Sequence, residues 1–276
     1  MRTPRLLATA VAAALLLSGC GIADARKAAI ANAAVKPLDM ATSLRPGLVG
    51  LADYPATGWE PSQVATPDNS GVVDPLALES IGLQPGDVSS SMTVGTIPDG
   101  DGLGAPTLDF CDGRYPSESL RVARLQRAAY DTDGNFAGIS SEVVVYANAV
   151  AAKQALAEAI KVRKACPTGT EFTSRDGHKL SFTFHSAPGP SSTPLVDANS
   201  RLVIHTTMLV DGEKRRAFIV YQIYGRVLAA LYASEAGGKP FDQTALDSFY
   251  MLAGDFADRL RAAPQTLLNG ETLTNA

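Results

Sequence analysis

The order of hydrophobic patterns between residues 120 and 260 is the feature that most constrains the fold of this chain. Apolar and polar residues alternate over 120–128 and again over 139–146, and a period of two residues is typical of a β-strand. Turn-forming residues at 131–135 separate the two runs, so the pair predicts a β-hairpin. Apolar residues then recur at spacings of three and four from Asn148 until Pro167, which favours a helix.

Further strands and a second helix follow in the sequence. Asp211-Gly212 between two alternating runs is a strong hairpin signal, so the strands on either side of it are predicted to pair antiparallel. Apolar residues at spacings of three and four predict an amphipathic helix over 241–260. The four strands between the helices are predicted at 179–186, 202–210, 216–224 and 227–233.

These elements define a fold class. Their order is β-β-α-β-β-β-β-α, which has too few helices for a parallel βαβ array. We expect an α+β domain with an antiparallel sheet of about six strands and two main helices packed on one face of the sheet.

The charge balance argues against one class of partner. The chain has 24 Lys and Arg residues against 28 Asp and Glu residues, a net charge of -4. Proteins that bind nucleic acids through the phosphates carry an excess of basic residues. We therefore expect no nucleic-acid partner.

The first twenty residues have the layout of a bacterial lipoprotein signal. Arg2 and Arg5 precede an uncharged, Ala- and Leu-rich run over 6–17. As a helix this run reaches about 18 Å, which is too short for the roughly 30 Å hydrocarbon core of a bilayer. It ends in Leu17-Ser18-Gly19-Cys20, which resembles a lipobox. We expect cleavage before Cys20 and a diacylglyceryl group on its thiol; the alternative is an ordinary signal peptide cut at a small residue.

Lipidation at Cys20 sets the expected location of the protein. Each buried acyl CH₂ contributes about 0.8 kcal/mol, and two or more acyl chains anchor a protein stably. We therefore expect the N-terminal lipid to hold the protein on the outer face of the plasma membrane. The membrane is thus an expected binding partner.

Composition divides the chain into four parts. The mature domain begins at Asp74-Pro75, because these residues place an N-cap and a proline at the start of a short helix. Many prolines and few periodic apolar residues precede this point. The expected parts are a signal peptide over 1–19, a lipid-anchored Pro-rich tether over 20–73, an α+β sensor-like domain over 74–263 and a C-terminal tail over 264–276.

The cysteine content agrees with export. One of the three cysteines is assigned to lipid, and Cys111 and Cys166 remain as a pair outside the reducing cytosol. We expect a disulfide between them, which would pin the end of the first long helix to the chain entering the first strand. The alternatives are two unpaired thiols and, less favoured, a metal site, because neither cysteine has a second Cys or a His at ligand spacing.

The common motifs of exported hydrolases are absent from the sequence. It contains no G-x-S-x-G, S-x-x-K or H-E-x-x-H pattern. His178, His185 and His205 could each serve as the base of a triad whose members lie apart in the sequence. His185 and His205 fall within predicted strands, where a histidine is more often structural.

Two charged segments could bind ions. The segment 131–142 has oxygen ligands at positions 1, 3, 5 and 12 of a calcium loop, but it has Phe136 at position 6, where that loop needs Gly. Its flanks alternate as strands, so we expect a hairpin turn. Arg121, Arg124 and Arg127 could receive an anion, and we expect them to form a solvated strand edge instead.

The layout of the chain resembles a known group of proteins. A lipobox, a Pro-rich tether, Asp-Pro-Leu-Ala-Leu at 74–78, Leu108-Asp109-Phe110-Cys111, a hairpin, an Ala-rich helix and Ala165-Cys166-Pro167 occur in that order. This layout is similar to that of actinobacterial lipoproteins related to the extracellular sensor domain of PknH-type receptor serine/threonine kinases.

The resemblance covers roughly residues 74–263. It implies a non-enzymatic α+β domain with an antiparallel sheet, a disulfide and a cleft for a ligand. This chain lacks a second cysteine pair in the domain and a tryptophan shortly before Cys166. Only Cys111 and Cys166 are therefore carried over from the resemblance.

Three functions stay open at this point. The leading hypothesis is a lipid-anchored, cell-surface binding or sensor-like domain without catalytic activity, whose ligand is a small molecule or an envelope protein. The second is a small exported hydrolase that draws on His185, His205, Asp197 and the serines of the 186–200 loop. The third is an envelope scaffold that binds another protein. The sequence implies no cofactor, no catalytic residue and no metal site, and it leaves the ligand-binding residues unassigned.

The lipobox gives the first prediction. The Cys20→Ser variant lacks the thiol that carries the lipid, so we expect it to leave the membrane fraction in a high-salt wash while the wild-type protein stays. Immunoblots of the washed membranes and of the supernatant measure the two pools. Retention of the variant in the membranes would show that lipid on Cys20 is not the anchor.

Overall fold

The structure is a computed structural model, and it describes residues 73–97, 100–108, 110–132, 136–173, 178–187, 195–236 and 240–270. The predicted signal peptide, Cys20 and residues 20–72 of the predicted tether lie outside the described residues. Among the helices that the structure describes, none is both long enough and apolar enough to span a bilayer.

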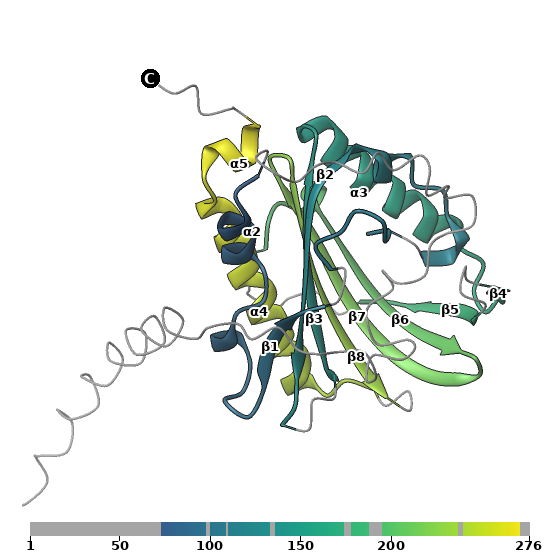
Figure 1. Cartoon of the computed structure of the whole chain (residues 1–276). Helices are drawn as coiled ribbons and strands as arrows, with labels where there is room; N and C mark the ends of the chain where they lie inside the picture. Colours follow the sequence, from purple (N-terminus) through teal and green to yellow (C-terminus); the bar gives the residue numbers. More distant parts are fainter. Residues whose placement is uncertain are drawn as a thin grey trace, which may run out of the picture. The chain divides into compact units, whose positions relative to one another are not determined.

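One antiparallel sheet of eight strands forms the centre of the domain (Figure 1). Its spatial order is β1-β2-β3-β8-β7-β6-β5-β4, and every neighbouring pair is antiparallel. The strands are β1 (Thr93–Thr96), β2 (Arg121–Tyr130), β3 (Phe136–Tyr146), β4 (Phe172–Thr173), β5 (Lys179–His185), β6 (Arg201–Val210), β7 (Glu213–Tyr224) and β8 (Val227–Ala236).

Two groups of sequential strands make up this sheet. Strands β1 to β3 are consecutive neighbours, and so are strands β4 to β8. The pairing of β3 with β8 joins the groups, from Ile139 opposite Ala233 to Val145 opposite Val227. This junction lies in the interior of the sheet, away from both edges.

Both predicted hairpins are present. Strand β2 pairs with β3, and β6 pairs with β7 with Val210 opposite Glu213. Asp211 and Gly212 connect β6 to β7 with φ angles of 51° and 84°. Two successive positive φ angles are what a two-residue type I′ hairpin turn requires, and Asp and Gly adopt them at low cost.

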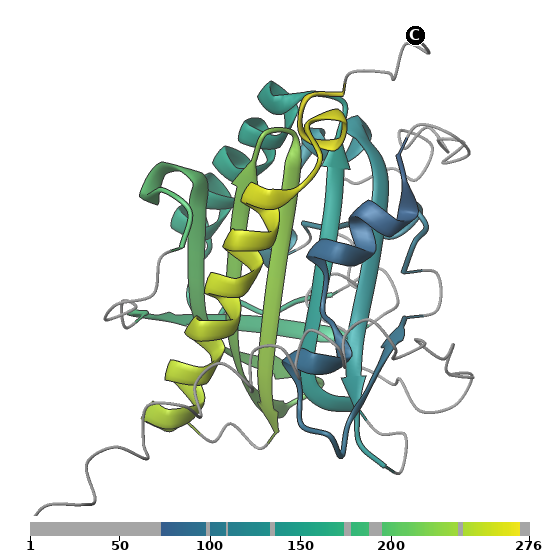
Figure 2. The same cartoon turned by 90° about the vertical axis from the view of Figure 1, so that its left-hand side faces the viewer.

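Helices cover both faces of the sheet, which gives the domain three layers (Figures 1 and 2). Helices α2 (Pro75–Ile81), α4 (Gln243–Ala262) and α5 (Gln265–Asn269) lie on one face, called here the α4 face, and α3 (Ala149–Ala165) lies on the other, the α3 face. Val143 and Val145 of β3 belong to the core on the α4 face, whereas Val144 and Tyr146 belong to the core on the α3 face. Successive residues of a strand point to opposite faces, so β3 contributes to both cores.

The expectation that the two main helices share one face is wrong. Strand β3 carries the apolar run 143–145, and all three of its residues are buried. A strand that is apolar on both faces needs cover on both faces, and α3 and α4 supply it from opposite sides.

The predicted number and order of strands are also wrong, because two short strands were missed. The sheet has eight strands rather than about six, and β1 precedes the predicted first strand while β4 follows α3. Strand β1 has four residues, including Gly95, and β4 has two. Neither is long enough to show a hydrophobic period.

The predicted starts of α2 and α3 are confirmed by their caps, and α4 begins within the predicted range 241–260. Asp74, Asn148 and Asp242 are the N-cap residues of α2, α3 and α4. In each case a side-chain oxygen accepts a hydrogen bond from a backbone N–H of the first turn, at 3.0, 2.9 and 2.7 Å respectively. Such a bond satisfies a donor that has no partner inside the helix.

The folded chain continues past the expected domain end at residue 263. Leu267 and Leu268 of α5 are buried in the core on the α4 face. Arg226 between β7 and β8 donates from Nε to the carbonyl of Leu267 at 2.7 Å, and its backbone N–H donates to Leu268. Part of the segment expected as a tail is therefore packed on the domain, and residues 271–276 lie outside the described residues.

The structure contains the disulfide between Cys111 and Cys166. It joins the 3-10 turn η4 (Phe110–Asp112) to the C-terminal end of α3, where Cys166 is the C-cap. The two cysteines are 55 positions apart, and β2, β3 and α3 lie between them. The bond therefore links the segment before the first hairpin to the helix that follows it.

The disulfide gives a prediction about stability. In the chain-entropy model, closing a loop of this length stabilises a protein by about 4 kcal/mol. We expect the Cys111→Ser/Cys166→Ser variant to lose up to about that amount in free energy of unfolding, measured by urea denaturation. The wild-type protein should show the same loss in reducing agent, and the variant should not respond to the reductant. Equal stability of the two proteins would contradict the prediction.

Candidate functional site

The three arginines of β2 lie in the protein interior. Arg121, Arg124 and Arg127 are 3%, 2% and 2% exposed, so the expectation of a solvated strand edge is wrong. Strand β1 pairs along part of this edge, and each guanidinium has an acidic partner. The partners are Glu118 for Arg121, Glu142 for Arg124 and Glu79 for Arg127.

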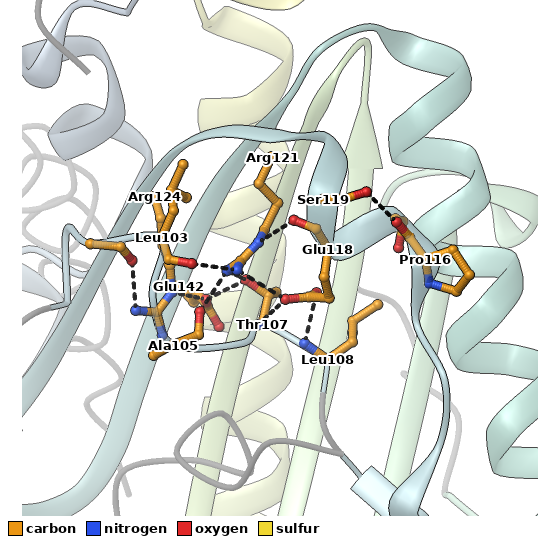
Figure 3. Close-up of polar contacts among 12 residues, drawn as sticks. Leu103, Ala105, Thr107, Leu108, Pro116, Glu118, Ser119, Arg121, Arg124 and Glu142 are labelled. Atoms are coloured by element: carbon orange, nitrogen blue, oxygen red, sulfur yellow. Dashed lines mark hydrogen bonds and ion pairs between the residues drawn. The ribbon is translucent and has the colours of Figure 1, made fainter. Parts of the chain in front are cut away.

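Two of these pairs form a buried charge network, made of Glu118, Arg121, Arg124, Glu142 and Thr107 (Figure 3). Arg124 Nε lies 2.5 Å from Glu142 Oε1, and Arg121 Nη2 lies 3.2 Å from Glu118 Oε2. The Thr107 hydroxyl connects the pairs: it donates to Glu142 at 2.7 Å and accepts from Arg121 at 3.0 Å. The positive and negative charges balance, which a buried network requires.

The charge network holds the segment 103–108 against the sheet. Arg121 donates to two backbone carbonyls of this segment, at 2.9 and 2.8 Å. The backbone N–H groups of Thr107 and Leu108 donate to the Glu118 carboxylate at 2.8 and 3.1 Å. Burial raises the pKa of Glu118, and the charge of Arg121 and these N–H groups act against that rise. The contacts of the network are thus internal, and its role is structural.

A pocket of about 230 Å³ opens on the α4 face, between the first half of α4 and the ends of β3 and β8. Figure 2 shows this face, with α4 in yellow crossing the strands. Most of the side chains that line the pocket are apolar. They include Ala245, Leu246, Phe249 and Leu252 of α4, together with Ile139 and Phe218 of the sheet.

Aromatic rings form one wall of the pocket. The Phe218 ring meets the rings of Phe241, Phe249 and Tyr250 edge-on, with centroid separations of 6.3, 5.3 and 5.5 Å. Edge-to-face packing at these separations is favourable for aromatic side chains. The wall is therefore a packed part of the core.

Four polar residues line the pocket: Asp87, Ser234, Glu235 and Ser248. Asp87, in the 3-10 turn η3 (Pro85–Asp87), accepts two hydrogen bonds from the guanidinium of Arg259 on α4, one of them at 2.8 Å from Nη1. Ser248 and Glu235 are exposed and also line the pocket. The carboxylate of Asp87 is thus neutralised within the protein, whereas Glu235 forms no ion pair among the described residues.

A glycine allows close approach of two strands beside the pocket. Gly138 of β3 has a φ angle of +81°, and a Cβ atom there would lie 2.7 Å from the carbonyl oxygen of Ser234 on β8. Both the backbone conformation and the space exclude a side chain. The shape of this end of the pocket therefore depends on glycine at position 138.

Two of the three histidines that the sequence singled out lie together near the aromatic wall. His185 of β5 and His205 of β6 are directly opposite each other, with ring centroids 5.0 Å apart. The His205 ring lies 5.3 Å from that of Phe218. The third, His178, pairs with Asp211 at 2.5 Å beside the β6–β7 turn.

The hydrogen bonds of the paired histidines differ from those of a catalytic triad. His185 Nε2 bonds to the Thr207 hydroxyl at 2.7 Å, and His205 Nδ1 lies 3.4 Å from the carbonyl oxygen of Ser186. No carboxylate of a described residue bonds to either ring, and Asp197 is the N-cap of the 3-10 turn η6 (Ala198–Ser200). Residues 188–194 of the loop that contains the candidate serines lie outside the described residues.

Burial lowers the pKa of both rings below their usual value. For His185 the charges of Arg216, His205 and Lys214 lower the pKa further. For His205 the carbonyl of Ser186 acts in the opposite direction, and the charge of Arg216 lowers the pKa.

The segment expected as a hairpin turn rather than a calcium loop connects β2 to β3, and residues 133–135 lie outside the described residues. Glu142, its last possible ligand, belongs to the charge network. Within the described ranges, no three His, Cys, Asp or Glu side chains come together as a possible metal site.

Large apolar side chains at the surface bear on the scaffold hypothesis. Five of them are exposed among the described residues, and each lies on a different helix or strand. They are Leu76, Val150, Leu209, Tyr224 and Met251. Single exposed apolar residues of this kind are common on soluble domains.

A search of solved structures finds similarity to the extracellular domain of PknH from Mycobacterium tuberculosis. The TM-score is 0.44 and the sequence identity is 16%, over 67% of this chain and 97% of that chain. No protein-family model matches the sequence, and no curated protein matches it.

The charge network gives a prediction about stability. The Arg124→Met variant leaves the buried Glu142 carboxylate without its cation, so we expect a loss of about 3–5 kcal/mol in free energy of unfolding. Urea denaturation measures it. The control is Lys179→Met, which breaks the exposed pair with Glu171 and should cost less than about 1 kcal/mol. Similar losses in the two variants would contradict a special role for the buried pair.

Proposed function

We propose that this chain is a lipid-anchored binding or sensor-like domain without catalytic activity on the outer face of the plasma membrane, and that the pocket beneath α4 holds an apolar ligand or the apolar part of one. The observation that carries the proposal is the pocket: a space of about 230 Å³ between a helix and a sheet, lined mainly by apolar side chains.

The composition of the pocket supports a binding role for this space. Small-molecule sites are concave and mostly apolar, with a few polar groups that orient the ligand. The pocket has this composition, because most of its lining residues are apolar and Asp87, Ser234, Glu235 and Ser248 are the polar ones.

The walls of the pocket are held in place by contacts within the protein. The aromatic rings around Phe218 pack edge-on against one another. The ion pair of Asp87 with Arg259 links η3, at one side of the pocket, to α4 at the other. A preformed site lowers the entropic cost of binding, which supports a role in ligand recognition.

Other features support the location and the absence of catalysis. The Leu17–Cys20 pattern favours lipid anchoring, and the Cys111–Cys166 disulfide favours an oxidising compartment. Among the described residues, His185 and His205 bond to a hydroxyl and a carbonyl rather than to a carboxylate, which favours a binding domain over a hydrolase.

Mass spectrometry of the protein extracted from the membranes of its own host tests this proposal. We expect the native spectrum to show a small molecule that is lost on denaturation, in addition to the acyl chains that stay on Cys20. The Ala245→Trp variant fills the pocket and should lose this added mass. Met251→Trp is the matched control, because Met251 lies on the same helix and is 64% exposed outside the pocket lining.

Two results would contradict the proposal. An added mass that persists in Ala245→Trp would place the ligand elsewhere, and the absence of an added mass in the wild-type protein would favour the scaffold hypothesis. Far-ultraviolet circular dichroism of both tryptophan variants shows whether they are folded.

A further inference from the structure

A row of basic side chains lies on the α4 face next to the pocket. It consists of His185 on β5, His205 on β6 and Arg216 on β7, and is called here the basic row. Arg216 Nη1 donates to His205 Nε2 across 3.4 Å. Phe218, two residues after Arg216 on the same strand, lines the pocket and lies 5.3 Å from the His205 ring. The basic row therefore adjoins the aromatic wall.

Arg216 also lies beside the margin of the pocket. It is directly opposite Glu235 of β8, and the Glu235 side chain lines the pocket. The register of β7 with β8 and β6 thus places Arg216 between the pocket and the two histidines. The acidic group of a ligand that binds Arg216 would therefore lie next to the apolar pocket.

The basic row has a local excess of positive charge. Lys214 is a further cation on β7 and contributes to the lowered pKa of His185. None of the described carboxylates acts on the pKa of either histidine. Arg216 forms no ion pair with Glu235 or with another described acidic residue. The Nε atom of Arg216 is buried and has no hydrogen-bond partner among the described residues.

We propose that the basic row binds the acidic group of the ligand whose apolar part occupies the pocket, so that the ligand is a single-chain anionic amphiphile, such as a medium-chain carboxylate. This inference rests on the proposed function of the pocket and names the class of its ligand.

The chemistry of Arg216 supports an acidic ligand. A guanidinium donates two parallel hydrogen bonds to a carboxylate, and such charge-assisted bonds are stronger than those between neutral groups. A buried donor without a partner carries a free-energy penalty that an incoming oxygen would remove. Glu235, opposite Arg216, repels negative charge and favours an anion of one charge over inorganic phosphate.

The histidines make the binding depend on pH. Both rings are mainly neutral at pH 7, because their pKa values are lowered. As the pH falls, each ring gains a proton and a positive charge, and a bound anion stabilises that charged form. Affinity for the anion therefore rises as the pH falls from neutral toward the lowered pKa values of the two rings.

The size of the pocket selects the probe. A pocket of about 230 Å³ is smaller than the roughly 300–1,000 Å³ typical of small-molecule sites, so a short single-chain probe is chosen. Octanoate and octanol are matched in length and differ in charge. Inorganic phosphate is the third probe, because it has charge without an apolar part.

Isothermal titration calorimetry of the mature lipidated chain in nanodiscs, with empty nanodiscs as the blank, tests the inference. At pH 5.5 we expect octanoate to bind at least about tenfold more tightly than octanol, and the ratio should fall at pH 7.5. Arg216→Gln should remove the preference for octanoate and keep the binding of octanol. Arg215→Gln is the matched control, because Arg215 belongs to the other face of β7 and pairs with Glu213.

Other outcomes would contradict the proposed anion site, the proposed pocket or both. Equal affinity for octanoate and octanol in the wild-type protein, with both lost in Ala245→Trp, would overturn the basic row as an anion site and leave the pocket standing. Binding of neither probe would overturn the proposed pocket as well. An equal loss of preference in Arg215→Gln, or phosphate binding as tight as that of octanoate, would overturn the assignment of an anionic amphiphile to Arg216 and the pocket.

Discussion

The buried ion pair between Arg124 and Glu142 is the interaction on which the α3 face of the domain depends. Both charges are removed from water, and a buried charge without its partner costs several kcal/mol, so each residue requires the other. Through Thr107 this pair is connected to a second ion pair that holds the segment 103–108 to the sheet. The disulfide at Cys111 then connects the following residues to the end of α3. An electrostatic link and a covalent link thus fix one continuous segment between the sheet and a helix.

The α4 face of the sheet is held mainly by apolar packing rather than by buried ion pairs. Its core is made of aliphatic and aromatic side chains from the sheet, α2 and α4. The ion pair of Asp87 with Arg259 is at the surface of this core and sets the separation of η3 and α4. Where α4 begins, the aromatic rings around Phe218 pack against one another and leave space toward β3 and β8. The pocket is therefore a product of helix placement, and its polar lining residues come from η3, β8 and α4.

The elements that the sequence predicted correctly are those with a strong local signal, such as the Asp211-Gly212 hairpin and the capped helices. Short strands gave no such signal, and the placement of α3 and α4 on opposite faces is decided by tertiary packing. The apolar run 143–145 does indicate cover on both faces of the sheet, because continuous apolar strands are typical of sheets buried on both sides. Of the candidate site, the sequence singled out His185 and His205. It could not find Arg216 or Phe218 as neighbours of His205, because their juxtaposition depends on the register of β6 with β7.

The strand order also determines how this chain can assemble during folding. Within each of the two groups of strands, most pairs are hairpin neighbours and can form early from local contacts. The pairing of β3 with β8 is different, since Val145 and Val227 are separated by 227 − 145 = 82 positions and must close a long loop before any contact compensates for the lost entropy. Until that step occurs, both groups expose an unpaired strand edge, which is the kind of edge that joins other chains. The Cys111–Cys166 disulfide closes a loop around β2, β3 and α3, so it restricts this part of the unfolded chain and leaves the loop between β3 and β8 as long as before.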